Sequence, residues 1–96
     1  MTDYEKEEII LTATNQETEG YRIERLNQVV GYICALAEHY GNKDLTGKIR
    51  SLDDHKGCLT VVWKAAPTAG EKEIIAKAWE SGIANEPAEN IVHTIL

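Results

Sequence analysis

The sequence predicts an α+β fold, in which two helices cover one face of a four-stranded antiparallel sheet. Apolar residues recur at steps of three and four over residues 21–40, which indicates one face of a long helix. Residues 58–66, CLTVVWKAA, alternate with a period of two, which indicates a strand. Ordered along the 96 residues, the elements form a single βαββαβ domain. Right-handed crossovers would place both helices on one side of the sheet, as in the ferredoxin-like arrangement.

The first half of the chain supplies one strand and the long helix. Residues 1–7 are polar and expected to be frayed. Residues 8–14, EIILTAT, are rich in β-formers and predict the first strand. Asn15 or Thr18 is expected to cap the helix, and Gly41 is expected to end it in a left-handed conformation.

The middle of the chain predicts two strands joined by a hairpin. Residues 48–53 are a weak second strand, because only Ile49 and Leu52 are apolar. Residues 54–57 are predicted to form the hairpin loop, with a glycine at its end. Residues 58–66 are apolar on both faces, which favours a central position, and the expected spatial order places strands one and three in the centre of the sheet.

The last third predicts a helix and a strand. Thr68 and Glu71 have the spacing of a capping box, after Pro67 has ended the third strand. The second helix is expected to close at Gly82, with Ile83 packing back on it. Residues 90–96, NIVHTIL, predict the last strand. On the sheet face that the helices leave uncovered, this strand is expected to place either Val92, Thr94 and Leu96 or Ile91, His93 and Ile95, because both sets alternate plausibly.

Composition and charge indicate a globular domain and argue against nucleic-acid binding. Hydrophobic residues make up 43% and charged residues 27%, as in an ordinary globular domain. Sixteen acids against ten bases give a net charge of −6, and the charged residues among the first 24 are mainly acidic, which disfavours binding to nucleic acid. The chain has no phenylalanine, and its third strand offers a single aromatic, Trp63, on which a base could stack.

The same composition sets expectations about compartment and redox state. No apolar run is long enough for a membrane span, and the start is acidic where a signal peptide is basic, so a cytoplasmic protein without membrane association is expected. Cys34 and Cys58 are expected to be separate thiols rather than a disulfide.

Two helices can cover only one sheet face. Leu11, Leu59, Val61 and Trp63 are expected beneath the helices. The residues expected on the other face are threonines, branched apolar residues, a cysteine and a lysine: Ile10, Thr12, Thr14, Cys58, Thr60, Val62 and Lys64. Three interpretations fit this face: a solvated surface, a self-association surface, or a platform for a ligand or partner.

The three histidines are candidate site residues. His39 is expected to meet the end of the long helix, and His55 with Asp53 and Asp54 at the hairpin is a weak metal candidate. His93, if it faced the uncovered side, could reach Thr12, Thr60 and Cys58, which would form a speculative ligand site. Neither catalytic residues, nor a metal, nor a cofactor are assigned.

The sequence therefore predicts an acidic, non-catalytic binding or regulatory module. The favoured hypothesis is a homodimer joined through Ile10, Thr12, Thr60 and Val62 on the uncovered face. The alternatives are a small-molecule-binding protein or cofactor-free enzyme with a pocket near His93 and Cys58, and an inhibitor-type protein that docks its acidic half on a basic protein partner.

Overall fold

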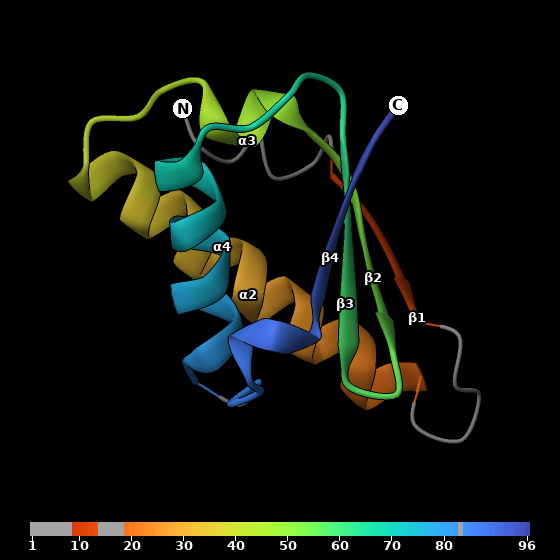
Figure 1. Ribbon diagram of the computed structural model, residues 1–96. Helices are drawn as coiled ribbons and strands as arrows, with labels where there is room; N and C mark the ends of the chain where they lie inside the picture. Colours follow the sequence, from red (N-terminus) through yellow and green to blue (C-terminus); the bar gives the residue numbers. More distant parts are fainter. Residues whose placement is uncertain (1–8, 14–18, 83) are drawn as a thin grey trace.

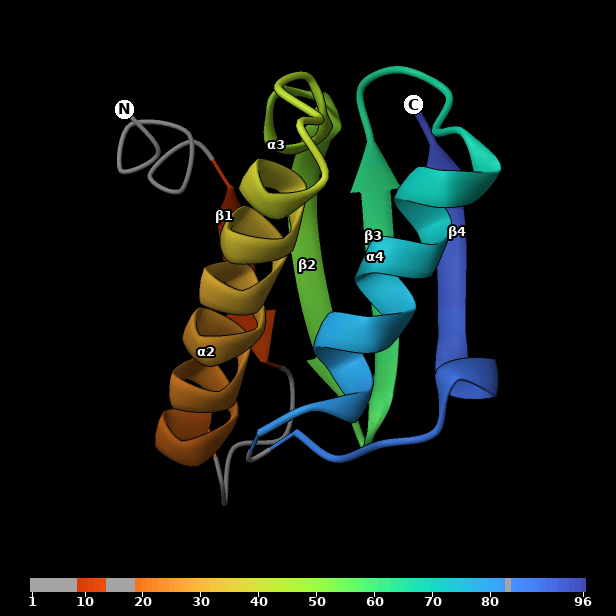
Figure 2. The ribbon, with the colours of Figure 1, turned by 90° about the vertical axis from the view of Figure 1, so that its left-hand side faces the viewer.

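A computed structural model describes residues 9–13, 19–82 and 84–96 of the chain, and it confirms an α+β fold with a four-stranded sheet (Figure 1). The strands are β1 (Ile10–Ala13), β2 (Ile49–His55), β3 (Cys58–Trp63) and β4 (Ile91–Ile95). Helices α2 (Glu19–His39) and α4 (Ala69–Glu80) lie side by side over one face of the sheet (Figure 2). A short helix, α3 (Leu45–Lys48), and a 3-10 turn, η2 (Ala88–Asn90), were not predicted.

The expected antiparallel sheet is wrong, and the ferredoxin-like arrangement is not confirmed. The strands lie in the order β1-β2-β3-β4, so β2 and β3 hold the centre. The outer pairs β1–β2 and β3–β4 are parallel, and β2–β3 is antiparallel, which makes the sheet mixed. Each crossover through a helix therefore joins neighbouring strands. Side-chain alternation is the same in both topologies, so it cannot tell them apart.

The helices form where the apolar spacing predicts them. The buried apolar residues of α2 follow steps of three and four: Leu26, Val29, Val30, Ile33, Cys34 and Ala37. Gly41 follows the end of α2 with φ +70°, a conformation that glycine adopts without strain. At α4, the predicted capping box is confirmed: Thr68 Oγ1 accepts from the Glu71 N–H at 3.1 Å, and the Glu71 carboxylate accepts from the Thr68 N–H at 2.9 Å.

The core lies between the helices and one face of the sheet. On β3, Leu59, Val61 and Trp63 are fully buried, as predicted. His93 lies opposite Val61 in the parallel β3–β4 ladder and therefore shares its face. The sequence left two orientations of the last strand open. The structure turns Ile91, His93 and Ile95 toward the helix side, and Val92 and Thr94 to the uncovered side.

The hairpin is tighter than predicted. Lys56 and Gly57 alone connect β2 to β3, with φ values of +55° and +79°, as a two-residue turn requires. Asp54, expected in the loop, instead belongs to β2 and is completely buried. The third strand ends at Trp63, three residues earlier than predicted.

Some expectations fall outside the described residues: the frayed start at 1–7, Thr14 on the uncovered face, a cap at Asn15 or Thr18, and the packing of Ile83. Within the described chain, Cys34 and Cys58 are both free thiols. Over the same residues, the helices are too short or too polar to cross a bilayer.

The surroundings of two glycines predict opposite effects of an added methyl group on stability. A Cβ at Gly82, where φ is +62°, would collide with the Gln28 side chain and lie 2.8 Å from Tyr32 Cε2, both on α2. A Cβ at Gly31 in α2 would meet nothing within 4 Å. We expect Gly82→Ala to lower the free energy of unfolding by about 1–3 kcal/mol, and Gly31→Ala to raise it by about 0.5–1 kcal/mol. Urea denaturation measures both, and a Gly82→Ala protein as stable as the wild type would contradict the packing of Gly82 on α2.

Candidate functional site

On the face of the sheet that the helices leave uncovered, two rows of side chains cross all four strands. The strand register aligns Ile10, Ser51, Val62 and Thr94 in one row, and Thr12, Asp53, Thr60 and Val92 in the next. We call these eight residues the open face. All four residues predicted as interface, Ile10, Thr12, Thr60 and Val62, lie on it, and their role in an interface stays a prediction.

Apolar side chains flank a polar centre on the open face. Ile10 on β1 is 54% exposed and Val92 on β4 is 50% exposed, so each outer strand presents a large aliphatic residue. Between them lie hydroxyl groups, the aliphatic side chain of Val62 and the carboxylate of Asp53. Isolated surface aliphatics are ordinary, but two of them bordering one polar centre resemble the mixed surface of a protein interface.

Asp53 is the unusual member of this face. Its Oδ1 atom is buried, and it has no hydrogen-bond partner within the described part of the chain. Thr12 on β1 and Thr60 on β3 flank it directly in the same row. A buried acceptor without a donor costs free energy, about 1–3 kcal/mol in measured cases. A partner that brought a donor to this carboxylate would recover part of that cost.

The speculative ligand site of Thr12, Cys58, Thr60 and His93 is not assembled. Thr12 and Thr60 lie around Asp53 on the open face, and Cys58 lies at the hairpin end of β3, opposite His55. His93 lies on the helix side of the sheet. Sequence reasoning named Asp53 only as part of a metal candidate. The alternation of β2 could have placed Asp53 on the uncovered face. It was missed because the apolar pattern that predicts this strand is weak.

His93 has a structural partner. The buried indole of Trp63 donates from Nε1 to His93 Nδ1 at 3.0 Å. This bond requires an unprotonated Nδ1, so the neutral ring carries its proton on Nε2. Burial, and secondarily the positive charge of Lys72, lower the pKa of His93. His93 therefore completes the core by satisfying an indole N–H.

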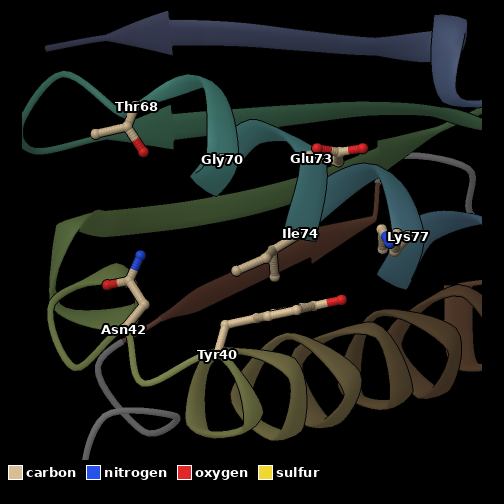
Figure 3. Close-up of a pocket in the computed structure, with 7 residues that line it drawn as sticks. All are labelled: Tyr40, Asn42, Thr68, Gly70, Glu73, Ile74 and Lys77. Atoms are coloured by element: carbon tan, nitrogen blue, oxygen red, sulfur yellow. The ribbon is translucent and has the colours of Figure 1, made fainter.

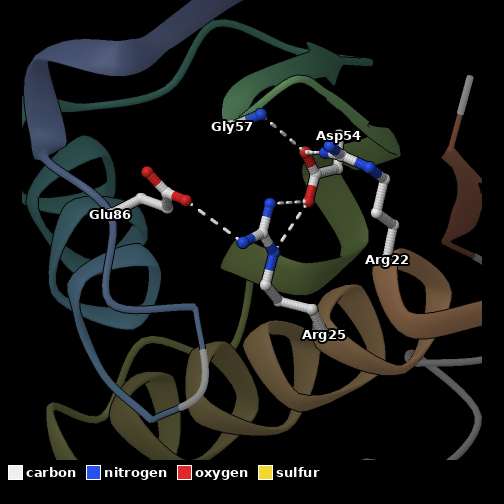
Figure 4. Close-up of polar contacts among 5 residues, drawn as sticks. All are labelled: Arg22, Arg25, Asp54, Gly57 and Glu86. Atoms are coloured by element: carbon white, nitrogen blue, oxygen red, sulfur yellow. Dashed lines mark hydrogen bonds and ion pairs between the residues drawn. The ribbon is translucent and has the colours of Figure 1, made fainter. Parts of the chain in front are cut away.

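A buried ion cluster lies beside the hairpin (Figure 4). Asp54 accepts from Arg25 Nε at 2.8 Å, from Arg22 Nη1 at 2.9 Å and from the Gly57 N–H at 3.2 Å. A second Arg25 nitrogen also contacts Asp54, and Arg25 Nη1 reaches Glu86 at 3.1 Å. Both oxygens of Asp54 are thus occupied by donors from the chain itself, which indicates a structural role. A group of three side chains able to hold a metal does not occur within the described ranges.

A cavity of about 330 Å³ lies between the end of α2 and the start of α4 (Figure 3). It is lined by Tyr40, Asn42, Thr68, Gly70, Glu73, Ile74 and Lys77. Beside it, Glu71 is bonded to Lys48 at 2.9 Å and to Asn42 at 3.0 Å. Burial alone would raise the pKa of Glu71, but the hydrogen bonds from Thr68, Lys48 and Asn42 outweigh it and lower the pKa.

The open face is the stronger of these two candidates. The Asn42 amide is already engaged within the chain, since its oxygen accepts from the Asp44 and Leu45 N–H groups and its nitrogen donates to Glu71. Thr68 is likewise committed to the capping box. The open face, by contrast, contains Asp53, whose buried Oδ1 atom has no hydrogen-bond partner among the described residues. Protein-family models, curated proteins and solved structures were all compared with this chain, and none matches it.

The ion cluster predicts different costs for two adjacent aspartates. Asp54→Asn removes the charge that balances two buried or half-buried arginines, and we expect it to lower the free energy of unfolding by about 3–5 kcal/mol. Asp53→Asn, the matched control one residue away, replaces a carboxylate whose Oδ1 has no partner among the described residues, and it should cost less than about 0.5 kcal/mol. Chemical denaturation compares the two. Equal losses from both variants would mean that the Asp54 cluster is not what stabilises this end of the sheet.

The Trp63–His93 bond predicts a pH dependence of stability. Because folding lowers the pKa of His93, the unfolded chain binds the proton more readily. This contribution to stability is complete above the usual value of about 6.5 and is lost as the pH falls from there through the lowered pKa of the folded state. We expect tryptophan fluorescence and the unfolding midpoint to change together in this window. His93→Gln should remove the transition and His39→Gln, at the exposed end of α2, should keep it; a transition unaffected by His93→Gln would contradict the assignment.

Proposed function

We propose that this protein is a non-catalytic binding module, that the open face is its binding surface, and that its partner is a protein presenting a lysine or arginine to Asp53. The observation that carries the proposal is the Oδ1 atom of Asp53 near the centre of that face, which has no hydrogen-bond partner in the part of the chain that the structure describes. Charged donors form the strongest hydrogen bonds with carboxylates. A chain of net charge −6 would also attract a basic partner over a distance.

The surroundings of Asp53 suit a protein surface rather than a small molecule. Its row and the neighbouring row span all four strands, with Ile10 and Val92 exposed on the two outer ones. Such a broad surface, with apolar borders and a few polar groups, is typical of protein interfaces. Small-molecule sites are usually concave and enclose most of the ligand.

Binding rather than catalysis is supported by the placement of the two candidate reactive groups. Cys58 belongs to the strand end at the hairpin, and His93 lies on the helix side of β4, where its Nδ1 is occupied by Trp63. A cysteine nucleophile needs a base within hydrogen-bond reach. The sheet separates this pair, so they do not form a nucleophile and its base.

A second copy on the same face, the arrangement expected from the sequence, is a weaker fit. Face-to-face packing would enclose two Asp53 carboxylates between chains that each carry a net charge of −6. Burying charges without opposite partners is costly. A cationic partner converts the same carboxylate into an attractive contact.

The test compares charge reversal on and off the open face. Wild type, Asp53→Lys and the control Glu80→Lys, which makes the same charge change on the exposed side of α4, are immobilised and offered an extract of the source organism. Captured proteins are identified and their affinities measured at two salt concentrations. We expect a specific partner to bind wild type and Glu80→Lys, to weaken in high salt, and to lose at least tenfold in affinity with Asp53→Lys. Equal binding by Asp53→Lys would contradict the proposal.

A further inference from the structure

β4 forms one edge of the sheet, and its outer side is open. It pairs only with β3 in the described part of the chain, and no helix or strand lies beyond it (Figure 2). Leu96 N–H donates to the Trp63 carbonyl at 3.0 Å, which shows that this residue turns its backbone groups toward β3. The backbone N–H and C=O groups of successive residues point to opposite sides of a strand. Those of Val92 and Thr94 therefore also point toward β3, and those of His93 and Ile95 point outward, away from the sheet.

This edge lacks the features that usually protect an edge strand. Its sequence, IVHTI, contains neither proline nor lysine nor an acidic residue. Its ladder with β3 runs without a bulge, whereas the β2–β3 ladder has one between Ile49 and Ser51. A regular, uncharged edge strand is a template for pairing with another strand.

Exposed aliphatic side chains gather at the same edge, on both faces. Among the described residues, the exposed large aliphatics are Ile10, Val92, Ile95 and Leu96, and three of these four lie on or directly after β4. Val92 is on the open face and Ile95 on the helix side. A partner seated on one face could not cover both, but a strand added alongside β4 would contact both.

We infer that a second copy of this chain pairs with β4 edge to edge, antiparallel, about a two-fold axis at Thr94. In this register His93 of one copy lies opposite Ile95 of the other, so the outward N–H and C=O groups of both residues bond across the axis. Ile91 does not take part, because its N–H already donates to the Ala88 carbonyl at the end of η2. On the open face, Val92 of each copy lies against Leu96 of the other, and the two Thr94 side chains meet at the axis.

Charge also favours this edge as the meeting place of two acidic chains. β4 carries no acidic side chain, and the charge that acts on its His93 is the positive one of Lys72 on α4. Repulsion between two chains of net charge −6 is therefore small where the strands meet. The resulting eight-stranded sheet would leave both open faces on one side and free for the partner proposed above.

The test measures mass in solution by light scattering from about 5 to 500 μM. Ile95→Lys places a charge on the edge, and Ile10→Lys is a matched control, because Ile10 is the same residue type, 54% against 55% exposed, on the opposite edge of the sheet. We expect a concentration-dependent dimer in the wild type, a dissociation constant at least tenfold weaker in Ile95→Lys, and no change in Ile10→Lys. A wild type that is monomeric throughout, or a dimer that Ile95→Lys leaves intact or Ile10→Lys disrupts, would overturn the inference.

A cross-link tests the register, and one further variant separates this inference from the proposed function. Directly opposed residues of a non-hydrogen-bonded antiparallel pair have Cα atoms about 4.5 Å apart, within disulfide reach. In a Cys58→Ser background, Thr94→Cys should form a covalent dimer on oxidation, and Thr12→Cys, on the far edge, should not. The reverse result would overturn the edge pairing.

Asp53→Lys should leave the dimer intact while abolishing partner capture. The edge pairing and the proposed partner binding can therefore each fail without the other.

Discussion

The buried carboxylate of Asp54 is the contact on which the arrangement of the elements depends. It lies near the end of a central strand and binds two arginines of α2, which fixes how that helix crosses the sheet. The Gly57 N–H donates to the same carboxylate and so connects the hairpin turn to it. Arg25 also donates to Glu86, in the segment that leads to β4 (Figure 4). Arg25 is further held near the rings of Tyr21 and Trp79, at 5.7 and 5.2 Å from their centroids. A second buried carboxylate, Glu71, anchors the other end of the helix layer.

Adjacent aspartates on β2 have opposite surroundings because a strand turns successive side chains to opposite faces. Asp54 lies under the helices, where every oxygen has a donor. Asp53 lies on the open face, where one oxygen has none among the described residues. A stabilising ion cluster and an unsatisfied acceptor therefore follow from the same short stretch of sequence. The helix-covered side of the sheet holds the fold together, and the other side, with the β4 edge, is where we propose that partners bind.

The sequence predicted what depends on local periodicity and missed what depends on distant contacts. The α4 capping box and the buried face of β3 follow from residues a few positions apart, so they were readable. The pairing of Asp54 with Arg25 spans 29 positions, and a polar stretch before a glycine is typical of a hairpin loop, so Asp54 was misplaced. The strand order was wrong for a related reason: alternation says which face a residue occupies but not which strand lies beside it. Four of the open-face residues were correctly grouped by that alternation, and Asp53 was missed because β2 is only weakly patterned.

The most direct measurement of the central claim is amide hydrogen exchange of β4, residue by residue, in dilute and concentrated solution. The Thr94 amide points toward β3, so its protection should be independent of concentration. The His93 and Ile95 amides point outward, and the account predicts that they exchange quickly in dilute solution and become protected as the concentration rises. Outward amides whose exchange did not change with concentration would contradict the claim that this edge receives a second chain.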